Sequence, residues 1–271
     1  MKTSMKKHIL SAVFASALAL PALQASVLVH EPFDYTVGSN IGGVAATGTG
    51  LTGNWQRTFT DTATATLRTY ETTWTPPTGY NFSTISKGIG TPVDQNNSAA
   101  VNLAAPAQIN FDANGTFYYS YLLNYSNVDD RSRVSFGSSS AVDLMRVQGV
   151  ASGALRAYAG GTFNEGLALG SGTFLVVGRM NTVVTGNDTN TIWVYSSSDT
   201  VPVTPGTAYT SAAAAVTGTA NMLQFSNVIN ARYGEFRMGT TWESVAIPEP
   251  SSLALLAMAV GGGLLLRRRR S

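Results

Sequence analysis

The chain contains no cysteine, and only 12% of its 271 residues are charged. The missing thiols exclude disulfide bonds, cysteine nucleophiles, cysteine-ligated zinc and iron–sulfur centres. Histidine is almost as scarce, with only His8 and His30. The charged fraction is about half of the ~25% that is usual for a soluble protein. Stability must therefore come from a large hydrophobic core, and a chain of this length can bury about 70% of its unfolded surface.

The distribution of charge argues against nucleic-acid binding. The formal net charge is +2, from 17 basic and 15 acidic residues. Three of the bases, Lys2, Lys6 and Lys7, lie at the N-terminus, and four arginines lie at the C-terminus. The rest of the chain keeps ten basic residues against 15 acidic ones, a net charge of about −5. Nucleic-acid binding needs a basic face, and this acidic body does not supply one.

Residues 1–25 are arranged like a secretory signal peptide. The three lysines precede a predominantly apolar stretch of twelve residues, 9–20, and a short segment that ends in the small residue Ala25. That stretch is too short to form a membrane-spanning helix. We therefore predict that the protein is exported and that cleavage after Ala25 makes Ser26 the first residue of the mature chain.

The C-terminus, 247–271, has three parts in order. A Pro248-Glu249-Pro250 motif comes first, an uncharged apolar stretch at 253–266 follows, and a basic cluster ends the chain: Arg267, Arg268, Arg269 and Arg270. A helix over the apolar stretch would be roughly 21 Å long, a little shorter than the ~30 Å hydrocarbon core of a bilayer. The arginines would hold its end in the cytoplasm. These residues predict a C-terminal transmembrane helix with the body outside.

Together these three parts resemble the PEP-CTERM sorting signal of exopolysaccharide-producing Gram-negative bacteria. The resemblance implies that a membrane-embedded exosortase recognises the tail and removes it. The protein would then pass to the cell envelope, the cell surface or the extracellular space. A plain membrane anchor remains the alternative.

Residues 26–246 show strand-like patterns and no long helical period. Apolar and β-branched runs recur at short spacing, with Gly, Asn and Asp between most of them, which is typical of an antiparallel β-sandwich or barrel. The alternation of strands and helices that marks α/β folds is absent. We predict one all-β domain whose strands include 27–29, 65–70, 116–123, 131–136, 141–147, 155–158, 173–184, 191–195, 222–228, 233–238 and 242–245.

Two regions of this domain differ in how well the sequence defines them. The clearest local feature is a hairpin from Phe174 to Tyr195, because its loop contains Gly186, Asn187 and Asp188, which tolerate the positive φ that such loops need. The region 38–92 is rich in Gly, Thr and Pro and has weak periodicity. We expect long loops there, with one or two strands.

Four short segments of the body, 27–35, 50–55, 174–195 and 235–242, resemble exported proteins with a concanavalin-A/laminin-G-like jelly roll. They correspond to an opening strand, a glycine–tryptophan segment, a central hairpin and a closing strand pair. Because each motif is short and structural, the resemblance implies a jelly-roll fold and leaves the activity open.

The acidic residues do not match a catalytic pattern. Jelly-roll glycosidases carry their carboxylates on one strand as E-x-D-x-x-E, and this string is absent. His30 could act as the base of a Ser–His–Asp triad, but no G-x-S-x-G elbow accompanies it. We read His30 as a polar residue at a strand end. We predict no enzymatic activity, with a polysaccharide-acting glycoside hydrolase or lyase as the alternative.

Two sets of residues could take part in binding. Trp74 and Tyr80 flank two prolines in a loop that we expect to be stiff and exposed, so that the rings could stack on sugars with little loss of entropy; local packing is the alternative. Laminin-G-like domains often hold calcium with loop acids, and the candidates here are Asp129, Asp130 and Asp188. Solvated turn acids are the alternative reading of those three.

These observations predict a non-catalytic structural or adhesive protein of the cell envelope or the exopolysaccharide matrix. Because the body is acidic and poor in charge, we expect weak binding of neutral extracellular polysaccharide. A passive surface coat that binds nothing is the other non-catalytic reading.

Overall fold

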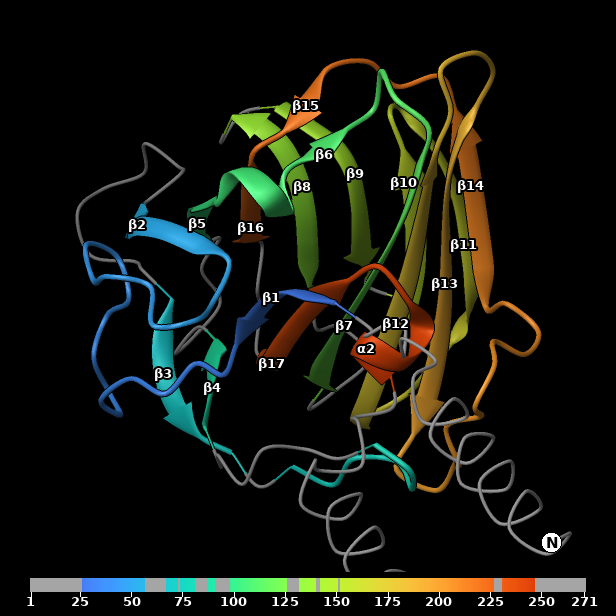
Figure 1. The fold of residues 1–271 in the computed structure, drawn as a ribbon. Helices are drawn as coiled ribbons and strands as arrows, with labels where there is room; N and C mark the ends of the chain where they lie inside the picture. The colour runs from blue at the N-terminus through green and yellow to red at the C-terminus, as the bar shows by residue number, and fades with distance from the viewer. Residues whose placement is uncertain are drawn as a thin grey trace, which may run out of the picture.

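The computed structural model describes residues 26–56, 67–72, 74–80, 87–90, 98–125, 132–139, 142–150, 152–226 and 231–246. Within these residues the regular structure is almost entirely β (Figure 1). All pairings within the sheets are antiparallel, which confirms the predicted all-β antiparallel sandwich. The signal segment 1–25 and the tail 247–271 lie outside the described residues.

Two large sheets form the sandwich (Figure 1). Among the described residues the eight-stranded sheet has the spatial order β14 (Thr210–Ala214), β13 (Asp188–Ser196), β12 (Gly172–Thr182), β7 (Gly115–Tyr125), β17 (Arg232–Gly239), β4 (Lys87–Gly90) and β3 (Arg68–Glu71), and β1 (Val27–Glu31) also pairs with β17. The seven-stranded sheet has the order β11 (Thr162–Ala168), β10 (Ala154–Ala159), β9 (Val142–Gly149), β8 (Arg133–Ser139), β16 (Met222–Ser226), β5 (Ser98–Leu103) and β2 (Leu51–Gln56). A small pair, β15 (Thr219–Ala220) with β6 (Ile109–Asn110), and the 3-10 turn η1 (Ala105–Ala107) complete the β region.

The predicted hairpin is confirmed as β12 and β13. Their register runs from Phe174 opposite Ser196 to Asn181 opposite Thr189. Asp188 closes the loop, because its two carboxylate oxygens accept the backbone N–H groups of Val183 at 2.9 Å and Val216 at 2.8 Å. The loop acid therefore fixes both the hairpin and the segment that follows β14.

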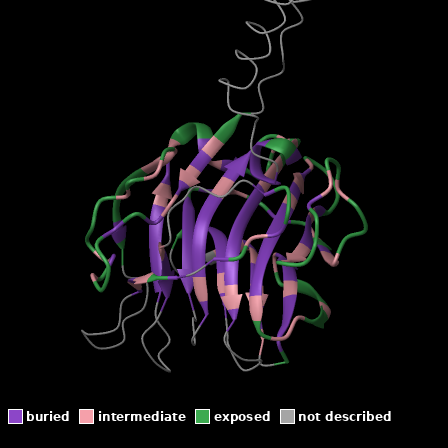
Figure 2. Cartoon of the chain, turned by 90° about the horizontal axis from the view of Figure 1, so that it is seen from below, coloured by how far each residue is buried: buried purple, intermediate pink, exposed green. Residues whose placement is uncertain are grey.

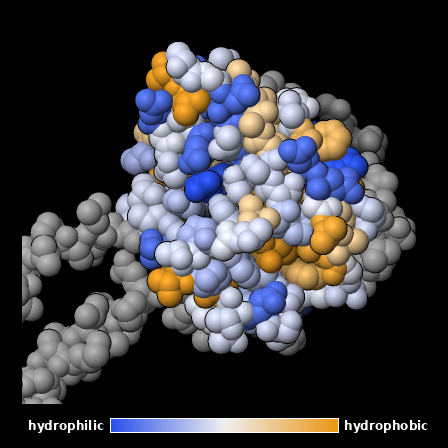
Figure 3. Space-filling view, turned by 90° about the vertical axis from the view of Figure 1, so that its right-hand side faces the viewer, coloured by the Kyte–Doolittle hydropathy of each residue, from blue (hydrophilic) through white to orange (hydrophobic). Residues whose placement is uncertain are grey.

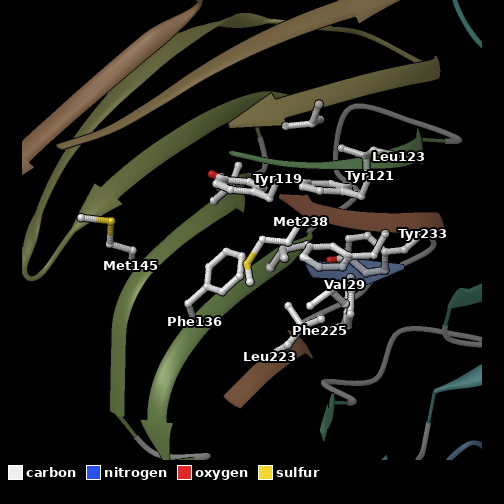
Figure 4. Close-up of a cluster of buried hydrophobic side chains, with 14 of the residues drawn as sticks. Val29, Tyr119, Tyr121, Leu123, Phe136, Met145, Leu223, Phe225, Tyr233 and Met238 are labelled. Carbon is white, nitrogen blue, oxygen red and sulfur yellow. The ribbon is translucent and has the colours of Figure 1, made fainter. Parts of the chain in front are cut away.

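The main core fills the space between the two sheets. Figure 4 shows Tyr119, Tyr121 and Leu123 of β7 close to Met238 of the neighbouring strand β17 and facing Phe225 of β16 in the opposite sheet. Alternate residues of each strand supply this core, as the period of two in a strand requires. Figure 2 shows the result, with buried strands in the middle and exposed loops around the rim.

A second, smaller core lies on the other face of the eight-stranded sheet. The short helix α2 (Trp242–Ala246) covers Leu122, Leu175 and Val177 there. The predicted strand at 242–245 was therefore wrong. Thr241 caps the helix by accepting the Ser244 N–H at 3.3 Å, as N-cap residues do. Trp242, Val245 and Ala246 then fall on one helical face and are buried together.

Several strands have no clear sequence signal. The described residues of the region 38–92 include three strands, β2, β3 and β4, where we expected one or two. Strands β5, β11 and β14 were not predicted. Strands β5 and β14 are rich in Ala, Ser and Thr, β11 contains Asn, Glu and Gly, and all three lack the β-branched alternation that indicates strands. Pairing with neighbouring strands decides their conformation.

Candidate ligand-binding face

The outer face of the seven-stranded sheet carries a row of polar and aromatic residues across five adjacent strands. Gln224 of β16 lies opposite Ser135 of β8, which lies opposite Arg146 of β9. Arg146 lies opposite Tyr158 of β10, and Tyr158 lies opposite Phe163 of β11. The chain neighbours of the first four residues belong to the main core, so these four point away from it. We call these five residues the polar row.

A second arginine and an aspartate lie beside the polar row. The Oδ2 atom of Asp143 pairs with Arg146 Nη1 at 3.1 Å and also with Nη2 of Arg133. Asp143 is three residues from Arg146, and this odd spacing would place it on the opposite face of a regular strand. The register between β8 and β9 shifts by one between Phe136 and Gly137, and such a β-bulge brings Asp143 to the outer face. We call Arg133 and Arg146 the arginine pair.

Aromatic rings lie against two arginines of this face, Arg146 and Arg156. The Arg146 guanidinium lies 3.9 Å from the centre of the Tyr158 ring, and the Tyr158 and Phe163 rings lie 5.0 Å apart. On the far side, Arg156 lies 4.7 Å from the Phe163 ring and its Nε donates to Glu165 at 2.6 Å. Such stacking restricts an arginine side chain to one orientation. This part of the sheet is therefore preorganised.

Several donors of this face have no partner. Among the described residues, Nε of Arg133, Nε of Arg146 and Oγ of Ser135 are buried and make no hydrogen bond. A buried polar group without a partner costs about 1–3 kcal/mol. These three groups lie on adjacent strands, and an oxygen acceptor that reached them would relieve this cost.

The electrostatics of the arginine pair also favour a ligand with oxygen acceptors. Burial lowers the pKa of Arg133 to about 10, and the neighbouring charge of Arg146 lowers it in the same direction. Asp143 supplies one negative charge to two guanidinium groups, so the three side chains carry a formal +1. A bound anion would relieve the repulsion between the arginines.

A second polar cluster surrounds His30, where β1 meets β17. Glu235 lies in a β-bulge of β17 and has a φ of 35°. Its Oε1 atom lies 3.1 Å from His30 Nε2 and 2.8 Å from Arg237 Nε. Burial alone would raise the pKa of Glu235, but the hydrogen bond from His30 and the charge and hydrogen bond of Arg237 outweigh it, so the pKa is lowered. The sequence suggested only that His30 ends a strand; its acidic partner comes from 205 residues away.

Glu31, beside His30, holds the loop that follows β1. Its oxygens accept the Phe33 N–H at 2.8 Å, the Tyr35 hydroxyl at 3.0 Å and the Gly48 N–H at 3.3 Å. Burial raises the pKa of Glu31, and these hydrogen bonds offset the increase in part. This carboxylate therefore orders the chain between 33 and 48.

The expectation that Trp74 and Tyr80 form an exposed platform was wrong. Their side chains are 9% and 6% exposed and belong to the second core. Trp74 Nε1 donates to the Lys87 carbonyl at 3.1 Å, and the Tyr80 ring lies 5.3 Å from the Arg237 guanidinium. The loop is anchored by backbone hydrogen bonds between Thr78 and the segment 199–201. Tertiary contacts cover both rings.

The calcium candidates do not come together in the described structure. Asp129 and Asp130 lie outside the described residues, and Asp188 is buried with both oxygens on backbone N–H groups. Asp188 is therefore not a solvated turn acid. In the part of the chain that the structure covers, no group of three or more His, Asp or Glu residues is arranged to hold a metal ion.

The remaining predicted site residues lie outside the described residues: Ala25, Pro248, Glu249, Pro250, Arg267, Arg268, Arg269 and Arg270. Ser26 is described and precedes β1. Within the described ranges, no helix has the length and apolar character needed to cross a bilayer.

Comparison with known proteins gives no family. No family model matches the chain, and no curated protein matches it either. Among solved structures, the chain is similar to a sialidase with a TM-score of 0.37 and 13% identity, over 69% of this chain and 16% of that one.

Two other solved structures match most of their own length. An endo-β-1,4-glucuronan lyase from the fungus Trichoderma reesei has a TM-score of 0.39 and 10% identity, over 78% of this chain and 98% of that one. The CBM2 module of an evolved Dit of Lactobacillus casei BL23 phage J-1 has a TM-score of 0.35 and 11% identity, over 80% and 96%. The function proposed below is therefore argued from this chain's own residues.

Proposed function

We propose that this chain is an exported, non-catalytic carbohydrate-binding protein of the cell envelope or extracellular matrix, and that it binds sugar on the outer face of the seven-stranded sheet. The observation that carries the proposal is the stack of Arg146, Tyr158, Phe163 and Arg156 beside buried donors without partners. Sugar rings have apolar C–H faces and polar rims, so they suit a site that combines aromatic surface with a few converging polar groups.

The exposure of Phe163 supports this location. Its side chain is 45% exposed on β11, in contrast to the buried rings of Trp74 and Tyr80. Figure 3 shows the side of the molecule where β11 and β14 lie, and hydrophilic and hydrophobic side chains are interspersed there. A ring that is open to solvent and next to hydrogen-bonding groups can stack on a ligand without unfolding the domain.

The finer fold and the sorting route belong to the same proposal. The four segments named above support a concanavalin-A/laminin-G-like jelly roll, and the order of Pro248-Glu249-Pro250, apolar stretch and arginines supports processing by an exosortase. Extracellular polysaccharide is then the partner that the mature protein meets.

Binding is tested on the purified full chain with a glycan array followed by calorimetry. Phe163→Ala should weaken sugar binding by about 1–3 kcal/mol, by analogy with base–aromatic stacking. Val184→Ala is the matched control, because Val184 is also exposed but lies in the β12–β13 loop of the other sheet. Equal binding by the two variants would contradict a site on this face.

The non-catalytic part has its own test. Incubation with neutral and acidic polysaccharides should release neither reducing ends nor unsaturated products. Turnover that is abolished by Glu235→Gln or Glu31→Gln would place the protein among glycoside hydrolases or lyases instead.

Processing is tested by intact-mass analysis of the protein recovered from envelope and medium. We expect a chain that begins near Ser26 and has lost 253–271. Recovery of the chain with Arg267 to Arg270 attached would replace sorting by a plain membrane anchor.

A further inference from the structure

The outer face of the seven-stranded sheet is locally basic, although the body as a whole is acidic. Arg133, Arg146 and Arg156 lie there with two carboxylates, Asp143 and Glu165. Arg156 and Glu165 neutralise each other, whereas Asp143 is the one acidic partner that the described residues supply to the arginine pair. The described side chains at the arginine pair therefore carry a local excess of positive charge, although the net charge of the whole body is negative.

The unpartnered atoms of the arginine pair are N–H donors of the kind that a carboxylate accepts. Arg146 uses Nη1 to contact Asp143, so its Nε–Nη2 edge is not engaged by that contact, and its Nε is buried without a partner among the described residues. The two parallel N–H bonds of such an edge match the two oxygens of a carboxylate. Arg133 adds a second unpartnered Nε and Ser135 an unpartnered hydroxyl, both from the neighbouring strand β8.

Contacts to both the guanidinium and the backbone of Arg146 restrict the position of this edge. The Tyr158 ring stacks on the Arg146 guanidinium. Asn190 Nδ2, from the opposite sheet, donates to the backbone carbonyls of both Arg146 and Tyr158 at 3.0 Å. A binding group that is held before the ligand arrives loses little entropy on binding.

We propose that the arginine pair and Ser135 bind the carboxylate of an acidic sugar, so that the ligand is a polysaccharide that contains uronate residues. This inference rests on the proposed carbohydrate function and names its ligand class. The carboxylate would add the negative charge that Asp143 alone does not supply to two arginines, and the adjoining sugar ring would lie toward Phe163.

A neutral sugar fits this site less well. A hydroxyl can accept a hydrogen bond from Nε, but it leaves the second guanidinium without a counter-charge in a partly buried place, and uncompensated buried charge is costly. The sequence-based expectation of a neutral ligand followed from the total charge. The pairing of β8, β9 and β10 gathers arginines that are 13 and 10 residues apart in the chain, and this changes the expected ligand.

The test compares three polymers on the purified full chain by calorimetry. Polygalacturonate supplies carboxylates, its fully methyl-esterified form removes the charge and keeps the sugar, and dextran sulfate supplies anionic groups that are not planar carboxylates. We expect polygalacturonate to bind at least ten times more tightly than the other two. Arg146→Gln should reduce that preference at least tenfold, and Ser135→Ala should reduce it by a smaller factor.

Arg232→Gln is the matched control variant. Arg232 also stacks on a tyrosine ring, at 5.1 Å from the centre of Tyr70, but it lies on β17 in the other sheet. It should keep the full preference for polygalacturonate. If thermal denaturation shows that Arg146→Gln is unfolded, Arg146→Lys replaces it in the test. Lysine keeps the positive charge but lacks the two parallel N–H donors of the guanidinium, so this variant should still lose most of the preference.

The outcomes separate this inference from the function on which it rests. Equal binding of acidic and esterified polymer, still weakened by Phe163→Ala, would overturn the acidic ligand and leave the sugar site. Equal losses in Arg146→Gln and Arg232→Gln, or tight binding of dextran sulfate, would overturn it in favour of general charge attraction. Absence of binding to any polymer or array glycan would overturn both proposals.

Discussion

Asn190 and Arg146 are joined across the two sheets of the sandwich. The Asn190 side chain begins on β13 of the eight-stranded sheet, and its Nδ2 atom donates to the Arg146 carbonyl on β9 at 3.0 Å. The same nitrogen donates to the Tyr158 carbonyl, while Oδ1 accepts the hydroxyl of Tyr119 at 2.9 Å. One buried amide therefore links the core of the protein to the strands that carry the proposed ligand site.

Replacing Asn190 with Ala should destabilise the domain by about 2–4 kcal/mol, because the change leaves a hydroxyl and two carbonyls buried without their partner. Urea denaturation measures the free energy of unfolding of each variant. Asn181→Ala is the control, since the Asn181 side chain accepts one exposed hydrogen bond from the Thr116 hydroxyl. This change should alter stability by less than about 0.5 kcal/mol. Similar losses in the two variants would show that the link between the sheets adds nothing.

Gly178→Ala should destabilise the domain by about 1–3 kcal/mol or more through overpacking. A Cβ atom at this position would lie 1.9 Å from Cζ of the Tyr119 ring, and the hydrogen bond to Asn190 restrains that ring. At Gly161, in the turn after β10, a Cβ would meet nothing within 4 Å, so Gly161→Ala should be nearly neutral. Thermal denaturation of both variants checks the contrast; a neutral Gly178→Ala would show that Tyr119 is free to move.

Trp74→Ala should act on stability rather than on binding alone. The Trp74 ring packs against the backbone of Gly88 and Gly234 on β4 and β17, and removal of a buried Trp side chain costs about 3–5 kcal/mol. Phe163→Ala removes an exposed ring and should cost less than about 1 kcal/mol. A Trp74→Ala protein that keeps its melting temperature and loses sugar binding would restore the loop 74–80 as a ligand contact.

The Glu235 carboxylate should make folding sensitive to acid. Because its folded-state pKa lies below the ordinary 4.5, its ionisation stabilises the fold above pH 4.5, and this stabilisation is lost as the pH falls through the lowered folded pKa. Glu235→Gln should cost about 3–5 kcal/mol at pH 7, since it removes the buried carboxylate that accepts from His30 and Arg237. The difference from the natural protein should shrink at pH 3.

Urea unfolding at pH 7 and pH 3 measures that difference. Asp34→Asn removes a carboxylate whose side chain is 55% exposed and paired with Lys87, and it serves as the control with little effect at pH 7. A Glu235→Gln cost that stays constant with pH would show that the charge of Glu235 does not contribute.

The sequence alone was sufficient for features that depend on nearby residues. The hairpin of β12 and β13 follows from a β-branched run, a Gly-Asn-Asp loop and a second such run, all within 25 residues. The all-β class follows from many such runs, because the period of two is a property of each strand by itself. The strand predicted at 242–245 failed in this same local range, where the Thr241 cap was visible but short apolar runs fit a helix or a strand equally well.

Only the tertiary structure decided where the polar side chains meet. The sequence places Arg146 and Arg156 between apolar neighbours, which indicates that both side chains point away from the core, and it places Arg133 between Ser132 and Val134. It does not show that a bulge brings Asp143 to the same face, or that β16 lies beside β8 although about 90 residues separate them in the chain. The burial of Trp74 and Tyr80 likewise depends on contacts with β4, β17 and the segment 199–201. Strand order and register are set by long-range pairing and packing over the whole core, so a local pattern fixes the face on which a residue lies but not its neighbours.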